Sequence, residues 1–284
     1  MDSPPINLDR LNAARLIVPL SPRVRLLLIG CGGTGSWLAP AVARVARLLR
    51  EKFSKTVVVG FVDPDDVEDK NTYRQNFCKA EVGCNKAVAL ATRYSLAWGV
   101  SISAATQNVS SSVIPSLDGY HYDDLTVLIG CVDNPGARRD IHRLVRDIGG
   151  TVFWLDCGNS SESGQVLIGR NDPGDGIRSF PLPGMCARVP LPSRQHKELV
   201  EKPKPGQKAK PAAPDDTTEL SCAEVAMLDD QGLTINQMIA SVAADYLVRL
   251  LLTQNLDKFQ TYVDLESGSM KSTYITQDNL RKFR

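Results

Sequence analysis

Residues 63–77, with the sequence DPDDVEDKNTYRQNF, bring together charged and amide side chains without an apolar period. Asp63 ends an apolar run, where an aspartate can accept hydrogen bonds from the hydroxyls of a ribose. Asn71 and Arg74 follow in a polar stretch, and an amide and a guanidinium both donate to phosphate oxygens. The types and order of these side chains predict a nucleotide-binding site.

A glycine-rich turn, GCGGTG at residues 30–35, supplies a second part of such a site. Gly30, Gly32 and Gly35 match the pattern G-x-G-x-x-G, with Gly33 inside the same turn, directly after an apolar run and before a helical period. Glycines let the backbone approach a phosphate closely, and a helix N-terminus presents free N–H groups to it. A turn that serves packing alone is the alternative, but this context favours phosphate binding.

Two further charged residues extend the pattern to later parts of the chain. Lys86 lies in GCNKA at the expected start of a helix, and Asp133 lies in GCVDN at the end of another apolar run. Together with Arg74, a second cation suits a triphosphate, and a carboxylate at the next strand end could hold Mg²⁺ against those phosphates. A nicotinamide dehydrogenase would leave these residues without a role. The set therefore favours ATP over a dinucleotide.

The elements that must position these residues alternate between two types. Continuous apolar runs predict buried strands at residues 23–30, 56–63, 125–133 and 151–158, with a shorter strand at 100–107. Helical periods between them predict helices at residues 34–53, 85–99 and 134–149. This alternation predicts an α/β fold with a Rossmann-like, doubly wound, mostly parallel sheet, in which ligands bind at the carboxyl ends of the strands.

The second half of the chain differs in pattern. Residues 161–169 predict a strand that need not be parallel, and residues 259–266 and 270–277 predict a hairpin. A long, apolar-faced helix is expected from about Leu233. Lysine- and proline-rich residues between these parts predict a flexible linker. We divide the chain into an N-terminal arm, an ATP-binding domain, a crossover linker and a C-terminal completion of the same domain with antiparallel strands, at residues 1–22, 23–192, 193–217 and 218–284.

Composition limits the classes of function. The 33 basic and 32 acidic residues leave a formal charge of +1, which gives no support to a nucleic-acid partner or an anionic membrane surface. No apolar run reaches the roughly 18 residues of a membrane helix, and the polar N-terminus does not resemble a signal peptide. Seven scattered cysteines without a C-x-x-C pair argue against a disulfide framework, so a reducing cytoplasm is the expected location.

As an ordered set, these motifs resemble the ubiquitin-activating and ThiF/MoeB superfamily. The resemblance is strong over about residues 23–170 and weaker over 219–265. Within the superfamily, the chain looks similar to ThiF-related proteins of the bacterial PRTRC plasmid cassette. The motifs that carry the resemblance are G-x-G-G-x-G, D-x-D-x-V, N-x-x-R-Q, G-x-x-K and a strand-terminal D-N, found here at Gly30–Gly35, at Asp63, Asp65 and Val67, at Asn71, Arg74 and Gln75, at Gly83 and Lys86, and at Asp133 and Asn134.

The resemblance implies a reaction and a role for each matching residue. The C-terminal carboxylate of a ubiquitin-like protein would attack the α-phosphate of ATP and give an acyl-adenylate and pyrophosphate. Asp63 matches the position that binds ribose, and Asp133 matches the magnesium ligand. The positions that match phosphate contacts are Asn71, Arg74 and Lys86. Such a step needs alignment of the reactants and neutralisation of charge more than covalent help.

Cys222, in TELSCAEV, resembles the acceptor cysteine that takes the activated acyl group in some relatives. A cysteine near a helix N-terminus is accessible and partly ionised in favourable cases, but many cysteines are simply small buried residues. Cys31, Cys131 and Cys157 are expected to fill space. Cys186 falls where many relatives begin a paired zinc site, but no partner pair follows, so we expect no structural zinc.

Family members commonly act as dimers and borrow an arginine from a partner subunit. Arg10 and Arg15, on a predicted helix starting near Asn7, are the candidates, although a surface arginine is the simpler interpretation. We therefore expect a homodimer. Two alternatives to adenylation of a ubiquitin-like protein remain. One is a nucleotide-binding scaffold subunit without turnover, and the other is a tRNA-modifying adenylating relative, which the balanced charge disfavours.

Overall fold

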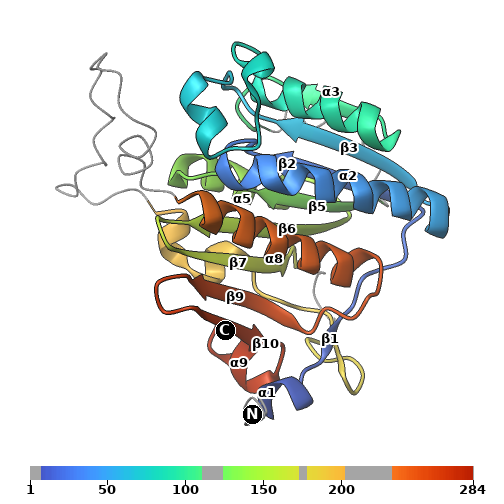
Figure 1. Ribbon diagram of the computed structural model, residues 1–284. Helices are drawn as coiled ribbons and strands as arrows, with labels where there is room; N and C mark the ends of the chain where they lie inside the picture. Colours follow the sequence, from blue (N-terminus) through green and yellow to red (C-terminus); the bar gives the residue numbers. More distant parts are fainter. Residues whose placement is uncertain (1–7, 111–123, 173–177, 202–231, 284) are drawn as a thin grey trace, which may run out of the picture.

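The computed structural model describes residues 8–110, 124–172, 178–201 and 232–283. Its main element is one eight-stranded sheet with the order β10-β9-β7-β6-β5-β2-β3-β4 (Figure 1). The strands are β2 (Arg23–Ile29), β3 (Thr56–Val62), β4 (Ile102–Ala105), β5 (Leu125–Gly130), β6 (Thr151–Asn159), β7 (Ser163–Arg170), β9 (Lys258–Asp264) and β10 (Ser269–Tyr274).

The five strands from β4 to β6 are parallel. In the centre, Leu27 of β2 pairs with Gly60 of β3 on one side and with Leu128 of β5 on the other. Because all five strands run in one direction, their carboxyl ends meet at one edge of the sheet. The predicted Rossmann-like, doubly wound sheet is confirmed, and the glycine turn after β2 lies at this edge.

The remaining three strands extend the sheet in antiparallel fashion. β7 runs antiparallel to β6, and β9 runs antiparallel to both β7 and β10. The turn between β9 and β10 includes Gly268 at a φ of +64°, a conformation that glycine adopts without strain. The predicted strand after β6 and the predicted C-terminal hairpin are therefore both present. The antiparallel strands predicted for the C-terminal part are confirmed.

Helices cover the two faces of the sheet. Figure 1 shows α2 (Gly33–Phe53), α3 (Lys86–Trp98) and α8 (Leu233–Leu251) side by side across one face. The opposite face packs against α5 (Pro135–Asp147). Alternation along β2 follows this division, since Leu26 and Leu28 belong to the core under α2 and α8, whereas Leu27 and Ile29 belong to the core under α5. The long helix predicted from about Leu233 is confirmed.

Short elements complete the fold. The turns after β3 form 3-10 helices, η1 (Asp69–Tyr73) and η2 (Lys79–Glu81). At the N-terminus, α1 (Leu8–Leu11) contacts β10, and β1 (Arg15–Leu16) pairs in parallel with β8 (Met185–Cys186). The helix expected near Asn7 is thus only four residues long. The chain ends with α9 (Gln277–Arg281), close to α1 and β10 in Figure 1.

The predicted flexible linker at residues 193–217 begins too early. Residues 192–199 form α6 (Pro192–Gln195) and η3 (Lys197–Leu199), and Ser193, Gln195 and Leu199 are buried. Gln195 Nε2 donates to Ile168 O at 2.9 Å and to Pro190 O at 2.6 Å, which fixes this segment on β7. The polar composition of this segment suggested disorder. It gave no sign that the Gln195 amide would bond to backbone carbonyls and so order the chain. Residues 202–217 of that prediction lie outside the described residues.

Among the described residues, no helix combines the length and the apolar character needed to cross a bilayer.

Candidate functional site

The glycine turn between β2 and α2 is packed so tightly that side chains are excluded. A Cβ on Gly35 would lie 1.9 Å from Gly30 O, and a Cβ on Gly30 would lie 2.5 Å from Cys131 O. Gly30 also has a φ of +88°, in the left-handed region that favours glycine. The turn therefore brings β2, β5 and the start of α2 into backbone contact, at the carboxyl edge of the sheet.

The N-terminus of α2 is suited to an anion. Gly32 is the N-cap residue, and no side chain caps the helix. A helix leaves its first N–H groups without intrahelical acceptors, and its dipole adds positive potential at the same point. The first turn here carries no acidic side chain. The predicted phosphate-binding turn is thus a bare helix start next to three glycines.

Asp63 lies directly after β3 and is buried beside the glycine turn. Its Oδ2 accepts a hydrogen bond from Cys31 N–H at 2.6 Å, and its Oδ1 accepts one from Asp65 N–H at 2.9 Å. Burial raises the pKa of Asp63 above its ordinary value, while these two hydrogen bonds and the charge of Lys86 act in the opposite direction. The carboxylate is held in one orientation and each oxygen retains a lone pair for a further donor.

The polar stretch after Asp63 folds back onto α2. Asn71 is buried, and its Oδ1 accepts from Glu68 N–H at 2.9 Å, so this amide caps η1. Arg74 O accepts from Trp37 Nε1 at 3.2 Å, which ties the loop to α2. Gln75 is also buried, and a Cβ on Gly32 would lie 3.9 Å from Gln75 Nε2. The predicted phosphate contacts at 71–75 therefore flank the glycine turn.

Gln75 Oε1 is buried and has no hydrogen-bond partner among the described residues. An unsatisfied buried oxygen costs roughly 1–3 kcal/mol, so a donor on a ligand would remove a standing penalty. Together with the uncapped helix and the glycine cradle, this oxygen fits a bound nucleotide.

Lys86 occupies the first position of α3 and points back towards β3. Its Nζ lies 3.2 Å from Asp65 Oδ2, and the lysine side chain is 9% exposed. Asn85 fixes this helix start, because its Oδ1 accepts from Ala87 N–H and its Nδ2 donates to Asp63 O. The positive charge of Lys86 acts to lower the pKa of Asp63 and the pKa of Cys31, against the larger effect of burial. The structure therefore brings the predicted cation and the predicted ribose aspartate together.

Asp133 follows β5 and is exposed at the same edge of the sheet. Its Oδ1 accepts from Asn134 Nδ2 at 3.3 Å, while Asn134 Oδ1 caps α5 by accepting from Ala137 N–H at 2.8 Å. No group of three or more metal-ligating side chains gathers in the described part of the chain. Mg²⁺ at nucleotide sites is commonly held by one or two carboxylates plus phosphates, so a single exposed aspartate fits that kind of site.

Of the described cysteines, Cys31, Cys157 and Cys186 are buried, Cys131 is partly buried, and Cys78 and Cys84 are exposed. Cys222 lies outside the described residues. Burial raises the pKa of Cys31 well above its ordinary value, and a hydrogen bond with Cys131 followed by burial does the same for Cys157. Burial also raises the pKa of Cys186 to about 11. Because the thiolate is the nucleophilic form, these buried cysteines are poor acceptors.

Arg10 is exposed on α1 and Arg15 is exposed on β1. Because α1 contacts β10, five places along the sheet order from β2, Arg10 belongs to a different part of the molecule than the glycine turn.

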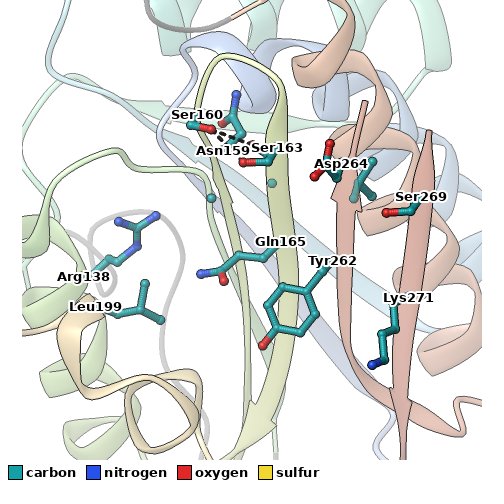
Figure 2. A pocket seen from close by; sticks show the side chains of 13 residues that line it. Arg138, Asn159, Ser160, Ser163, Gln165, Leu199, Tyr262, Asp264, Ser269 and Lys271 are labelled. Atoms are coloured by element: carbon teal, nitrogen blue, oxygen red, sulfur yellow. Dashed lines mark hydrogen bonds between the residues drawn. The ribbon is translucent and has the colours of Figure 1, made fainter. Parts of the chain in front are cut away.

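A cleft of about 610 Å³, lined mainly by polar residues and called here the polar cleft, was not predicted from the sequence. Its lining residue Asn159 contacts Thr34 of the glycine turn. The cleft lies on the α5 face of the antiparallel strands (Figure 2). One row of cross-strand partners lines it, Gly158 on β6, Gln165 on β7, Tyr262 on β9 and Lys271 on β10. Ser160 in the turn after β6 and the strand residues Ser163, Asp264 and Ser269 also line it.

Arg138 of α5 is the buried cation of this cleft. Its Nε donates to Asp156 Oδ1 at 3.1 Å, and Asp156 is its only partner among the described residues. Figure 2 shows the guanidinium facing the strands of the cleft. Burial raises the pKa of Asp156, and the charge of Arg138 opposes that effect. The unpaired ends of the guanidinium can bind an anion such as a carboxylate.

Tyr262 is oriented by a second polar chain. His196 Nδ1 lies 2.8 Å from Glu198 Oε1 and His196 Nε2 lies 2.6 Å from Tyr262 Oη. Since the carboxylate accepts, a neutral ring donates through Nδ1 and accepts from the phenol through Nε2. Burial, and then the charge of Glu198, raise the pKa of Tyr262, so the phenol stays protonated at neutral pH.

Sequence patterns contained a signal for the missed residues. Arg138 lies at helical spacing with Ile141 and Val145, so it is a cation on an apolar helix face. Asn236 follows Ile235 on α8 and precedes Ile239 by three residues, so it is an amide beside the buried apolar positions of this helix. The exposed row on β7, β9 and β10 gave no signal, because only the strand register brings those residues together.

Comparisons with known proteins agree with this arrangement. The sequence profile of the ThiF family matches residues 21–280. No curated protein sequence gives a significant match. Among solved structures, PaaA is similar with a TM-score of 0.52 at 20% identity, over 89% of this chain and 64% of PaaA. MccB of E. coli, solved with ATP, is similar with a TM-score of 0.51 at 14% identity, over 94% of this chain and 65% of MccB.

MccB, described as a biosynthetic enzyme of microcin C7, is also known in complex with N-formylated MccA, where the TM-score is 0.53 at 14% identity, over 94% of this chain and 66% of MccB. At these identities the likeness shows a shared fold. The chain spans about two thirds or less of the length of these structures.

Proposed function

Because the chain belongs to the ThiF family, we propose that it is an ATP-dependent enzyme that adenylates a carboxylate at the end of a peptide or protein. One observation carries the proposal. Asn159 lines the polar cleft, and its Oδ1 lies 3.2 Å from Thr34 Oγ1 in the first turn of α2. The phosphate-binding turn and the cleft with its buried arginine thus adjoin, which is the arrangement needed to bring a carboxylate to a phosphorus atom.

The residues that would hold ATP are those at the strand ends. The glycine turn and the start of α2 would bind phosphates, and Asp63 would accept from the ribose hydroxyls. Lys86, Arg74 and Gln75 would donate to phosphate oxygens. Asp133 would hold Mg²⁺, which supplies charge neutralisation at the phosphates when bound.

The carboxylate substrate would enter through the cleft. Arg138 would bind and orient the carboxylate before reaction, because its guanidinium has donors that Asp156 does not use. A carboxylate oxygen would form a bond to the α-phosphorus as the bond to the bridging oxygen of pyrophosphate breaks. The chain contributes orientation and positive charge to this step and no covalent group.

A ubiquitin-like protein with a free C-terminal carboxylate is the substrate that we propose, with the protein acting as a homodimer. MccB shows that a similar fold is compatible with ATP and with MccA, a separate molecule. In the proposed second step, the thiolate of Cys222 attacks the acyl carbon, the bond to the adenylate oxygen breaks and AMP leaves.

ATP–pyrophosphate exchange tests the first step. Purified protein, Mg²⁺ and each candidate ubiquitin-like protein should give exchange that depends on one carrier. The same carrier with an amidated C-terminus is the matched control and should give none, because it lacks the attacking oxygen. Exchange without any carrier, or with the amidated one, contradicts the proposal.

Cys222→Ser tests the second step. The variant should retain exchange but lose any adduct that dithiothreitol releases, as measured by intact mass. Cys78→Ser is the control, since Cys78 is an exposed cysteine away from the cleft lining. An adduct that persists in Cys222→Ser assigns the acceptor elsewhere.

A scaffold subunit without turnover is the second candidate. One of the proposed phosphate contacts is already engaged, since Lys86 is paired with Asp65. Binding of ATP without exchange, for every carrier, would favour this function.

A further inference from the structure

Three polar side chains from distant parts of the sequence meet behind the glycine turn. Thr34 lies in the first turn of α2, Asn159 ends β6 and Asn236 lies on α8. Thr34 Oγ1 is 3.2 Å from Asn236 Oδ1 and 3.2 Å from Asn159 Oδ1, and Asn159 Nδ2 donates to Asn236 Oδ1 at 3.1 Å. The cluster is shared by the helix start, the sheet and α8.

Asn236 is the centre of this cluster. It is completely buried, and its Oδ1 accepts from Asn159 Nδ2. The Thr34 hydroxyl lies within hydrogen-bond distance of both Asn236 Oδ1 and Asn159 Oδ1. Asn236 Nδ2 donates to Gly232 O at 3.2 Å. One amide therefore holds the glycine turn, the cleft and its own helix together.

Close packing adds to these hydrogen bonds. A Cβ on Gly33 would lie 2.4 Å from Asn236 Oδ1, so the first turn of α2 rests directly on this side chain. Gly232 N–H donates to Ser161 O at 3.1 Å, which fixes the start of α8 to the turn between β6 and β7. Ser160 of that turn and Ser163, which begins β7, line the cleft. A movement of Asn236 would shift the phosphate-binding turn relative to the cleft.

We propose that Asn236 is a positioning residue that holds the phosphate-binding turn of α2 at a fixed distance from the substrate cleft. The inference rests on the proposed function, since it assigns the two sides of the cluster to the two reactants. A buried amide that only stabilises the fold would affect unfolding, whereas a positioning residue affects the rate with both substrates bound.

Asn236→Ala removes the links to Thr34 and Asn159. Displacement of one reactant by about 1 Å can lower a rate by up to roughly 100-fold, so we expect kcat of exchange to fall about 10- to 100-fold with KM for ATP changed less than about threefold. Asn279→Ala is the matched control, because Asn279 is also a buried amide, bonded to Tyr274 O near the chain end. It should lower Tm and leave kcat within about twofold. Loss of Tm in both variants with kcat retained in both would overturn the proposal.

Asn236→Asp tests the contact between residue 236 and the first turn of α2 by adding a negative charge there. Its readout is binding, so it does not depend on turnover. A carboxylate beside the first turn of α2 would repel phosphates but not an uncharged nucleoside. By calorimetry we expect Kd for ATP to rise about tenfold and Kd for adenosine to change less than about twofold. Equal changes for ATP and adenosine, or no change, would overturn the proposal.

These measurements separate the two proposals. If the wild-type protein binds ATP but shows no exchange with any carrier, the proposed function fails, and the comparison of ATP with adenosine still decides whether Asn236 positions the phosphate-binding turn. A wild-type protein that binds neither ATP nor adenosine overturns both.

Discussion

The two halves of the candidate site would recognise their ligands by different means. At the parallel end, the glycine turn offers backbone N–H groups, and a Cβ on Gly30, Gly33 or Gly35 would lie within 2.5 Å of another atom. At the antiparallel end, the cleft is lined by side chains such as Gln165, Tyr262 and Lys271 on strands that face it. Backbone recognition tolerates no substitution, whereas side-chain recognition can be adjusted residue by residue.

The largest effect is expected where the backbone is most crowded. Gly35→Ala would place a Cβ 1.9 Å from Gly30 O, so the turn must open and ATP affinity should fall at least about 100-fold by calorimetry. Gly99→Ala is the control, because Gly99 also has a positive φ, of +60°, but no atom lies within 4 Å of its Cβ position. It should lose about 1 kcal/mol of stability and keep its ATP affinity. Normal ATP affinity in Gly35→Ala would contradict recognition of ATP by the backbone of the glycine turn.

Asp133 is one of the side chains that complete the backbone-built end. Asp133→Ala should lower the rate of Mg²⁺-dependent exchange by about 100- to 1,000-fold with Tm unchanged, because an exposed carboxylate contributes charge to the site and little to packing. Asp147→Ala, at an exposed aspartate that ends the helix following Asp133, α5, should leave the rate unchanged. Exchange at the wild-type rate in Asp133→Ala would remove Asp133 from the site.

Arg138 tests the side-chain half. Arg138→Met should raise KM for the carrier about 10- to 100-fold and leave KM for ATP nearly unchanged, since the loss of a charged hydrogen bond is worth about 1.5–3 kcal/mol. Arg146→Met, at an exposed position of the same helix, is the control. Equal changes in both KM values would mean that the two halves are not separate.

The same variant has a predicted pH dependence of stability. Removing Arg138 leaves Asp156 buried and unpaired, at a cost of about 3–5 kcal/mol. Burial already raises the pKa of Asp156, and the loss of the cation raises it further. A raised folded-state pKa means that the native state binds more protons than the unfolded state, so stability falls as pH rises from the unfolded value towards the folded one.

The deficit of Arg138→Met, measured by urea unfolding, should therefore be larger at neutral pH than near pH 4. The double variant Arg138→Met/Asp156→Asn should recover stability at neutral pH while keeping the high KM for the carrier. A deficit that is independent of pH would contradict the assignment to Asp156.

The smallest effect is expected at Tyr262. Tyr262→Phe removes one hydroxyl from the cleft wall and its bond to His196, so KM for the carrier should rise about three- to tenfold, as the loss of one hydrogen bond predicts. Tyr274→Phe on β10 is the matched control outside the cleft. A change in KM for ATP in Tyr262→Phe, with none for the carrier, would contradict the assignment of the cleft to the carrier.

The same contrast explains what the sequence could predict. The parallel strands, the glycine turn and the strand-terminal aspartates are local patterns, because a buried strand followed by G-x-G-x-x-G determines its own geometry. The cleft depends on register, which brings Gln165, Tyr262 and Lys271 together although they are far apart in the chain. No local pattern contains that information.

One misassignment had a physical cause. Residues 193–199 appeared too polar for ordered structure, but Gln195 is buried by donating to two backbone carbonyls. The amide of Asn71 likewise satisfies the backbone, since its oxygen caps η1, while its predicted phosphate contact through Nδ2 stays a prediction. A sequence does not show which of its possible partners an amide selects.

The cross-strand row of the cleft would also present a bound substrate with contacts at regular intervals. Adjacent strands lie about 4.8 Å apart, so the four positions from Gly158 to Lys271 span roughly 14 Å at fixed intervals. Each position can change identity without disturbing the backbone hydrogen bonds that set the spacing. A lineage with this sheet could therefore exchange one carrier for another by drift along the row, while the nucleotide end stays constant.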